Sequence, residues 1–179
     1  MIPATTRAVA AIGPARHPAH ALRNRLDELM RLVMTLPTEV YGARTARVSG
    51  AIGEHVRHAL DHVAALVAAP ASTVLSYDGR GRGTAIESDP AAAVREIMRL
   101  DAALERWSHR RLEEPVAVTA IVSPDGQTVT GWSSLGRELA FVLSHTIHHQ
   151  AIVALLLEGQ GYRLTDDRFG VAPSTPTRA

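Results

Sequence analysis

The sequence predicts a mainly α-helical fold, an up-down four-helix bundle with a short β-hairpin before its last helix. Of the 179 residues, 46% are hydrophobic but only 4% are aromatic. A core built from Leu, Ala and Val suits packed helices better than a β-sandwich. Apolar residues also recur at helical spacing in four stretches that proline or glycine separates. The length is sufficient for one domain with a hydrophobic core.

The first two helices are predicted at 21–36 and 48–67. In both stretches apolar residues form a stripe at intervals of three and four. Pro37 ends the first pattern and Pro70 closes the second, because proline cannot continue a helix from within. A connection containing Gly42 joins the two.

The segment 76–84 reads Ser-Tyr-Asp-Gly-Arg-Gly-Arg-Gly-Thr, and its glycine density predicts a loop. Asp89 then offers a capping carboxylate directly before Pro90, a residue favoured at the first helical position. These two residues predict the start of a third helix, which continues to Trp107.

A β-hairpin is predicted between 116 and 130, where β-branched residues flank the turn sequence Ser-Pro-Asp-Gly. The last helix should begin at Ser133 or Ser134 and end at Gly159 or Gly161. Three parts of the chain follow from this pattern. They are a loosely ordered arm at 1–18, a helical-bundle domain at 19–161, and a tail at 162–179 that packs on or near the bundle.

Composition narrows the classes of function. Nineteen Lys and Arg against eighteen Asp and Glu give a net charge of +1, so no strong field favours nucleic acid. No signal peptide and no uninterrupted run of about 20 apolar residues is present, so we expect a cytoplasmic protein without a membrane segment. The chain has no cysteine. Imidazole and carboxylate are therefore the available ligands for a transition metal.

Histidine spacing points to a metal site in the last predicted helix. His145 and His149 are four residues apart, which places both imidazoles on one face of a helix, together with apolar residues that face the core. Two helical histidines supply only part of a coordination shell. A second cluster, in the second predicted helix, offers His55, His58 and His62, and the apolar stripe favours His55 or His62 as a third ligand.

Glu138 lies seven residues before His145, hence two turns away on nearly the same face. It could accept a proton from a ligand imidazole or act on a bound substrate, and we take it as the candidate catalytic residue. It could equally serve as a capping carboxylate of the last helix.

Two motifs resemble those of the DinB-like four-helix-bundle proteins. They are Ile-Gly-Glu-His-Val-Arg-His at 52–58 and the His-x-x-x-His of 145–149, and the resemblance spans about 21–161. It implies one metal ligand from the second helix and two from the last, namely His58, His145 and His149. Family members often carry Arg-Gly after the last ligand, where this chain has Gln150-Ala151.

Three imidazoles leave a coordination position open on one divalent ion such as Zn²⁺, Ni²⁺ or Fe²⁺. Such an ion can lower the pKa of bound water or of a thiol, which opens hydrolysis and thiol-group transfer. The resemblance favours a transferase or isomerase that uses a low-molecular-weight thiol. A metal-dependent hydrolase is the chemical alternative.

The glycine-rich loop contains a candidate binding patch for a small-molecule substrate. Arg80 and Arg82, with Tyr77 and Asp78, could hold a carboxylate. A non-enzymatic alternative is a stress-related interaction module. A homodimer is expected in either case, because the last helix is apolar over much of its circumference.

Overall fold

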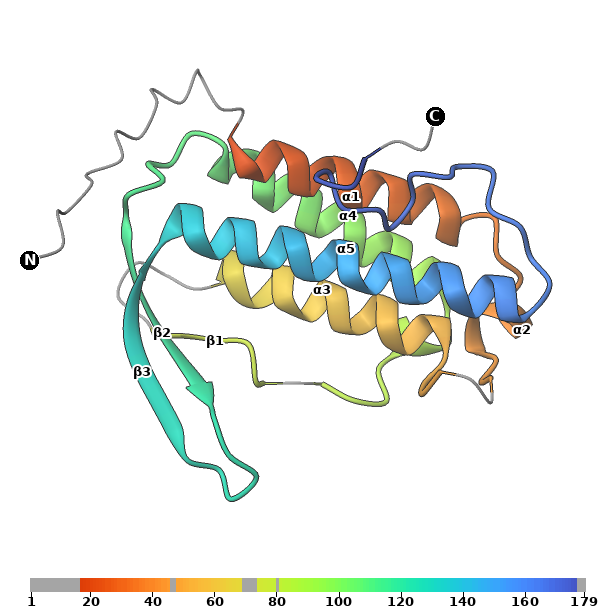
Figure 1. Ribbon diagram of the computed structural model, residues 1–179, viewed down its shortest axis with the longest axis horizontal. Coiled ribbons are helices and arrows are strands. Elements are labelled where there is room, and N and C mark those ends of the chain that lie inside the picture. The colour runs from red at the N-terminus through yellow and green to blue at the C-terminus, as the bar shows by residue number, and fades with distance from the viewer. Residues whose placement is uncertain (1–16, 46–47, 69–73, 80, 177–179) are drawn as a thin grey trace, which may run out of the picture.

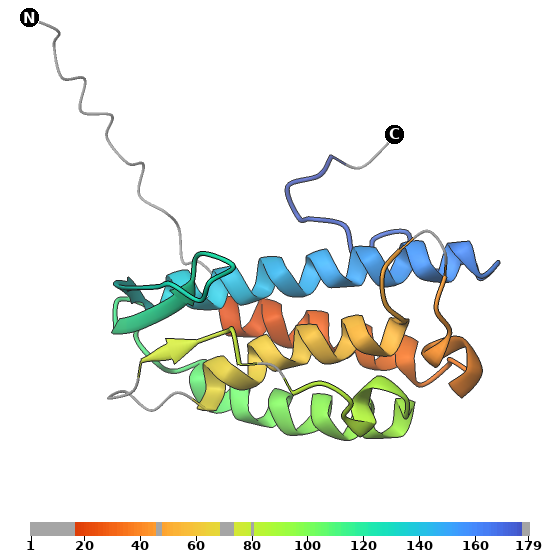
Figure 2. The same ribbon diagram turned by 90° about the horizontal axis from the view of Figure 1, so that it is seen from below.

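The computed structural model describes residues 17–45, 48–68, 74–79 and 81–176, and within these ranges the chain is mainly α-helical (Figures 1 and 2). Most of the predicted arm at 1–18 and the candidate residue Arg80 lie outside them. The elements in chain order are α1 (Pro18–Val33), α2 (Thr38–Gly42), α3 (Ile52–Ala68), β1 (Leu75–Ser76), the 3₁₀ turn η1 (Ala85–Glu87), α4 (Pro90–Trp107), β2 (Pro115–Ile121), β3 (Thr128–Ser134) and α5 (Leu135–Gly159).

The long helices α1, α3, α4 and α5 lie side by side around one core. α1 and α3 each contact both α4 and α5, and leucine, valine and isoleucine fill the space between them. The helix predicted at 21–36 is α1, which begins and ends three residues earlier. The helix predicted at 48–67 is α3, which begins later, at Ile52.

The order of helix directions differs from the predicted up-down arrangement. Figure 1 shows α1 and α5 running one way and α3 and α4 running the other, so the consecutive helices α3 and α4 are parallel. The cause is the connection between them, because it returns along the helices before α4 begins. The connection ends with η1, which packs against the start of α3 at Gly53.

Side-chain caps fix the starts of two helices, and both predicted starts are confirmed. The Asp89 carboxylate accepts from the backbone N–H of Ala91 at 2.9 Å, directly before Pro90. The Ser134 hydroxyl accepts from the N–H of Arg137 at 3.3 Å at the start of α5. These bonds satisfy backbone donors that the helix itself leaves unpaired.

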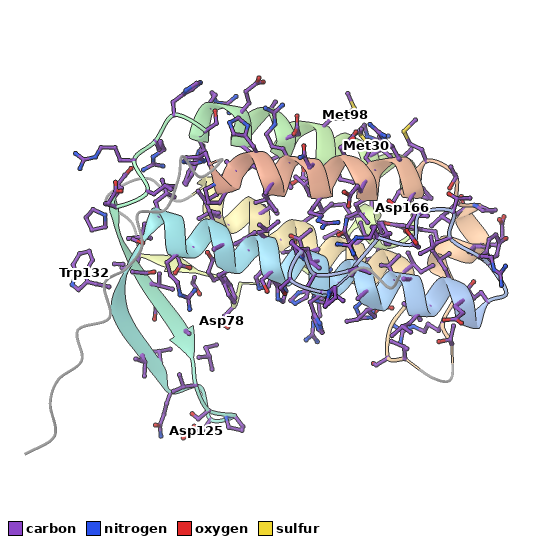
Figure 3. All side chains as sticks on the ribbon, turned by 45° about the horizontal axis from the view of Figure 1, so that its top comes forward. Met30, Asp78, Met98, Asp125, Trp132 and Asp166 are labelled. Atoms are coloured by element: carbon purple, nitrogen blue, oxygen red, sulfur yellow. The ribbon has the colours of Figure 1, made fainter. Side chains whose placement is uncertain are left out.

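The predicted hairpin is present, and it belongs to a sheet of three strands in the described part of the chain. β2 and β3 pair antiparallel from Pro115 opposite Ser134 to Ile121 opposite Thr128. β1, in the segment predicted to be only a loop, adds to the other edge of β2 in parallel. The hairpin extends beyond the helices (Figure 1), and Figure 3 shows Trp132 on its outside, where 81% of the residue is exposed.

α5 is the most apolar of the long helices. By length and composition it could cross a membrane, with a mean hydropathy of 1.5, but 44% of that stretch is buried inside the protein. It contacts both α1 and α3, and the tail folds back so that Phe169 joins the core. These features are typical of the central helix of a globular protein.

Gly53 fixes the position of η1 against α3. A Cβ atom at this position would lie 2.1 Å from the carbonyl oxygen of Glu87 and 2.6 Å from a ring carbon of Tyr41. The Tyr41 hydroxyl donates to the carbonyl of Ile86 at 2.8 Å, so α2, η1 and α3 are joined at one place. Glycine is required here for close approach of two backbones.

Gly53→Ala should therefore destabilise the fold by about 1–3 kcal/mol, because the added methyl group overpacks this contact. Urea unfolding of the variant measures the loss. Gly42→Ala is the matched control, since a Cβ there meets nothing within 4 Å. A Gly53→Ala variant as stable as Gly42→Ala would show that η1 does not pack closely on α3.

Candidate metal centre

The packing of α3 against α5 brings histidines from both helices together. His58 and His62 lie one turn apart on α3, and His145 and His149 lie one turn apart on α5. One potential ligand atom each from His58, His62 and His145 lies within 4.8 Å of the others. The ring centroid of His149 lies 4.6 Å from those of His58 and His145. Both clusters that the sequence singled out therefore belong to one site.

The relative orientation of the rings distinguishes two sets of three. His58, His145 and His149 are inclined to one another by 74°, 79° and 61°. His62 instead stacks on His145, with centroids 3.8 Å apart and planes 26° apart. An imidazole binds a metal through a lone pair in its ring plane, so stacked rings converge poorly on one ion. Distance favours His62 as a third ligand, and ring orientation favours His149.

A hydrogen-bonded chain orients His149. One nitrogen of His55, Nε2, lies 2.8 Å from the carbonyl oxygen of Ser49, and the other, Nδ1, lies 3.2 Å from Nδ1 of His149. A carbonyl can only accept, so a neutral His55 donates through Nε2 and accepts at Nδ1. His149 must then donate through Nδ1. Its Nε2 keeps the lone pair that a metal needs.

His62 is oriented in a similar way. Its Nδ1 lies 3.1 Å from the carbonyl oxygen of His58, to which it donates. On one side of its ring lies His145, and Tyr77 stacks on it in nearly parallel planes, with centroids 5.2 Å apart. This arrangement makes His62 part of the wall of the site.

Burial keeps His149 neutral, which is the form that binds metal. His149 is 7% exposed. Burial, and then the charges that His145, His58, His55 and His148 would carry, lowers the pKa of His149 to about 2. His148 itself is exposed, as its position on the flank of the helix predicted.

Glu138 is buried beside the site, in a network of its own. Its carboxylate accepts from the Tyr77 hydroxyl at 2.9 Å and from the Ser133 hydroxyl at 2.6 Å. Burial and the Glu138 charge raise the pKa of Tyr77, so that hydroxyl stays protonated and donates. Among the described hydrogen bonds, Glu138 therefore reaches the histidines only through Tyr77, which stacks on His62. This geometry suits a positioning role.

The described residues of the predicted carboxylate-binding patch, Tyr77, Asp78 and Arg82, have different partners in the structure. Tyr77 turns inward to Glu138. The Asp78 carboxylate accepts from the backbone N–H of Ile121 at 2.8 Å and so supports the end of β2 (Figure 3). Arg82 lines a pocket of about 550 Å³ together with His55, His58 and His149. Arg82 and Tyr77 are thus the described members of the predicted patch that border the histidines, Arg82 through the pocket and Tyr77 through His62.

The donor set fits a divalent ion. In a tetrahedral site, two ligand atoms that each lie about 2.1 Å from the ion are about 3.4 Å apart. The ligand atoms of His58, His62 and His145, within 4.8 Å of one another, would need to close by up to about 1.4 Å on binding it.

Sequence reasoning missed the roles of several partners. The apolar stripe favoured His55 as a possible third ligand, but in the structure its side chain orients His149. Arg57 is 7% exposed and forms ion pairs with Asp61 at 2.5 Å and Glu87 at 2.9 Å. The i, i+4 spacing of Arg57 and Asp61 could have predicted the first pair. Gln150 stands where the DinB-like proteins often have arginine. Its side chain donates to the carbonyl of Arg25 on α1 at 2.8 Å.

The metal-free protein should lose stability as the pH falls below about 6.5, the ordinary pKa of histidine. The pKa of His149 is depressed to about 2 in the folded state, so the unfolded chain gains a proton that the folded chain excludes. Urea unfolding at about pH 7.5 and about pH 5 measures this loss. It should be smaller in His149→Gln and unchanged in His109→Gln, a change at an exposed position. Equal losses in both variants would contradict the assignment.

Tyr77→Phe should cost about 1–3 kcal/mol, because it leaves a buried carboxylate oxygen of Glu138 without its donor. Denaturant unfolding measures the change. Tyr162→Phe is the control, since Tyr162 is 43% exposed and its substitution should have almost no effect. If the two variants are equally stable, the Tyr77 to Glu138 bond contributes nothing to the fold.

Comparison with known proteins gives one limited similarity. The chain is 35% identical to FK506-binding protein 5 of Rhizopus delemar over 104 residues, which is 58% of this chain. The matched part is 27% of that protein's length. No protein-family model matches the chain, and no solved structure matches it.

Proposed function

We propose that this chain is a DinB-like four-helix-bundle protein that binds one divalent metal ion through His58, His145 and His149. The observation that carries the proposal is the convergence of imidazoles from α3 and α5. Mutually inclined rings and the chain from Ser49 through His55 to His149 support His149 as the third ligand. His62 is the alternative, because its ligand atom is close to those of His58 and His145.

The proposed activity is transfer or isomerisation with a low-molecular-weight thiol. Zinc, nickel or iron(II) bound by three imidazoles would lower the pKa of a thiol and hold it as a thiolate. The pocket beside His58 and His149 would admit the thiol and a small-molecule substrate. Tyr77 and Glu138 would keep His62 in place as one wall of the site.

Two other functions share the same site. A metal-dependent hydrolase would use bound water in place of the thiol. A stress-related homodimeric module would need no turnover, and the exposure of Leu155 on α5, at 59%, is consistent with such a contact. The open pocket beside the histidines favours an enzyme over a closed structural site.

A cytoplasmic location without membrane or nucleic-acid partners belongs to this proposal, supported by the packing of α5 in the core and the net charge of +1. The similarity to FK506-binding protein 5 covers 27% of that protein. The ligand in its name therefore gives no basis for a substrate here.

Protein purified without an affinity tag should contain about one equivalent of metal per chain by elemental mass spectrometry. His58→Ala, His145→Ala and His149→Ala should each lose it while staying folded, and His62→Ala should retain it. Conjugation of a small thiol to monochlorobimane should stop on chelation and return with metal.

Three results would contradict the proposal. Loss of metal in His62→Ala with retention in His149→Ala would show that His62, and not His149, is the third ligand. No metal in the wild-type protein, even after several ions are offered, would leave a structural cluster of histidines. Release of acid from a nitrophenyl ester without any thiol conjugation would favour the hydrolase.

A further inference from the structure

The pocket beside the histidines is lined by three arginines and by two glutamates, Glu54 and Glu87. His58 and His149, two of the proposed ligands, border it together with Arg44, Arg57 and Arg82. Its volume of about 550 Å³ suits a small molecule. A positive side chain this close to a thiol-binding metal would attract a negative group elsewhere on the thiol.

Two of these arginines already have carboxylate partners. Arg57 is buried and pairs with Asp61 and Glu87, and Arg44 pairs with Glu54 at 2.5 Å. Both guanidinium groups form ion pairs within the protein itself. In each case the neighbouring carboxylate offsets the attraction of the guanidinium for an anionic ligand.

Arg82 differs from the other two. Within the described part of the chain, no carboxylate lies within ion-pair distance of its guanidinium, and the residue is exposed at the pocket. A guanidinium presents a fork of N–H donors that matches a carboxylate in geometry. Arg82 is therefore the arginine at this pocket that is available to a ligand.

The backbone beside Arg82 is anchored to α3. The N–H of Gly83 donates to one carboxylate oxygen of Glu87 at 3.1 Å. The other oxygen of Glu87 lies 2.9 Å from Nε of Arg57. Glu87 itself belongs to η1, which Gly53 allows to pack closely on α3. The backbone next to Arg82 is thus held at a defined place beside the histidines. A binding residue requires such a fixed position.

We propose that Arg82 binds the carboxylate of a small thiol whose sulfur reaches the metal, so that the site selects thiols that carry a carboxylate. The inference rests on the proposed metal site and names its substrate class. On binding, the S–H bond breaks, the sulfur keeps the electron pair and the proton passes to solvent. The carboxylate is already ionised at neutral pH and forms its ion pair with Arg82 without further chemistry.

The test uses the cobalt(II)- or nickel(II)-loaded protein and three probes of similar size: 3-mercaptopropionate, 2-mercaptoethanol and cysteamine. Thiolate binding to either ion gives a charge-transfer absorption band, and its titration gives a Kd for each probe. In the wild-type protein 3-mercaptopropionate should bind at least about tenfold more tightly than 2-mercaptoethanol, and cysteamine should bind most weakly.

Arg82→Gln should remove most of that preference, because it should weaken the binding of 3-mercaptopropionate far more than that of 2-mercaptoethanol. Arg106→Gln is the matched control, because it removes the same charge from an exposed position on α4 that does not line this pocket. It should retain the full preference. Since 3-mercaptopropionate can also chelate a metal through its own carboxylate, the change between variants, rather than the wild-type preference, is decisive.

Each contrary outcome has a separate meaning. If no probe gives a band with the loaded wild-type protein, the proposed metal and thiol chemistry fails, and the role of Arg82 fails with it. If the bands form but Arg82→Gln keeps the preference, Arg82 does not bind the carboxylate although the metal site stands. If Arg106→Gln loses as much preference as Arg82→Gln, net charge alone is responsible and the proposal is overturned.

Discussion

The antiparallel packing of α3 against α5 is the contact on which the rest of this structure depends. On each helix, two histidines four residues apart face the interface between α3 and α5, so the two pairs form one cluster. Several imidazoles in so small and buried a volume are tolerable only while they are neutral. The low pKa of His149 meets that condition for this ring, and hydrogen bonds to backbone carbonyls orient His55 and His62.

The connection from α3 to α4 is the second constraint. It returns along the helices, adds β1 to the sheet and ends in η1, which packs at Gly53 beside the start of α3. The same connection contributes Tyr77 to one side of the histidine cluster and Arg82 to its pocket. A segment without a long regular element therefore builds two walls of the candidate site.

Local signals predicted the helices well, because capping residues, proline and apolar periodicity act within a few residues. Asp89 and Ser134 are examples, and so are the paired strands of the hairpin. The parallel direction of α3 and α4 could not be predicted, since glycine-rich connections specify no path. The i, i+4 spacing predicted that His145 and His149 share a face. It could not show that His62 stacks on His145, because that contact joins two helices.

Anomalous diffraction at the metal absorption edge, from crystals of the metal-loaded protein, would test the central claim most directly. One strong peak should lie between α3 and α5, about 2.0–2.2 Å from one nitrogen each of His58, His145 and His149. The pocket that Arg82 borders should open onto the remaining coordination position. A peak elsewhere, or none at this cluster, would contradict a metal centre built from these histidines.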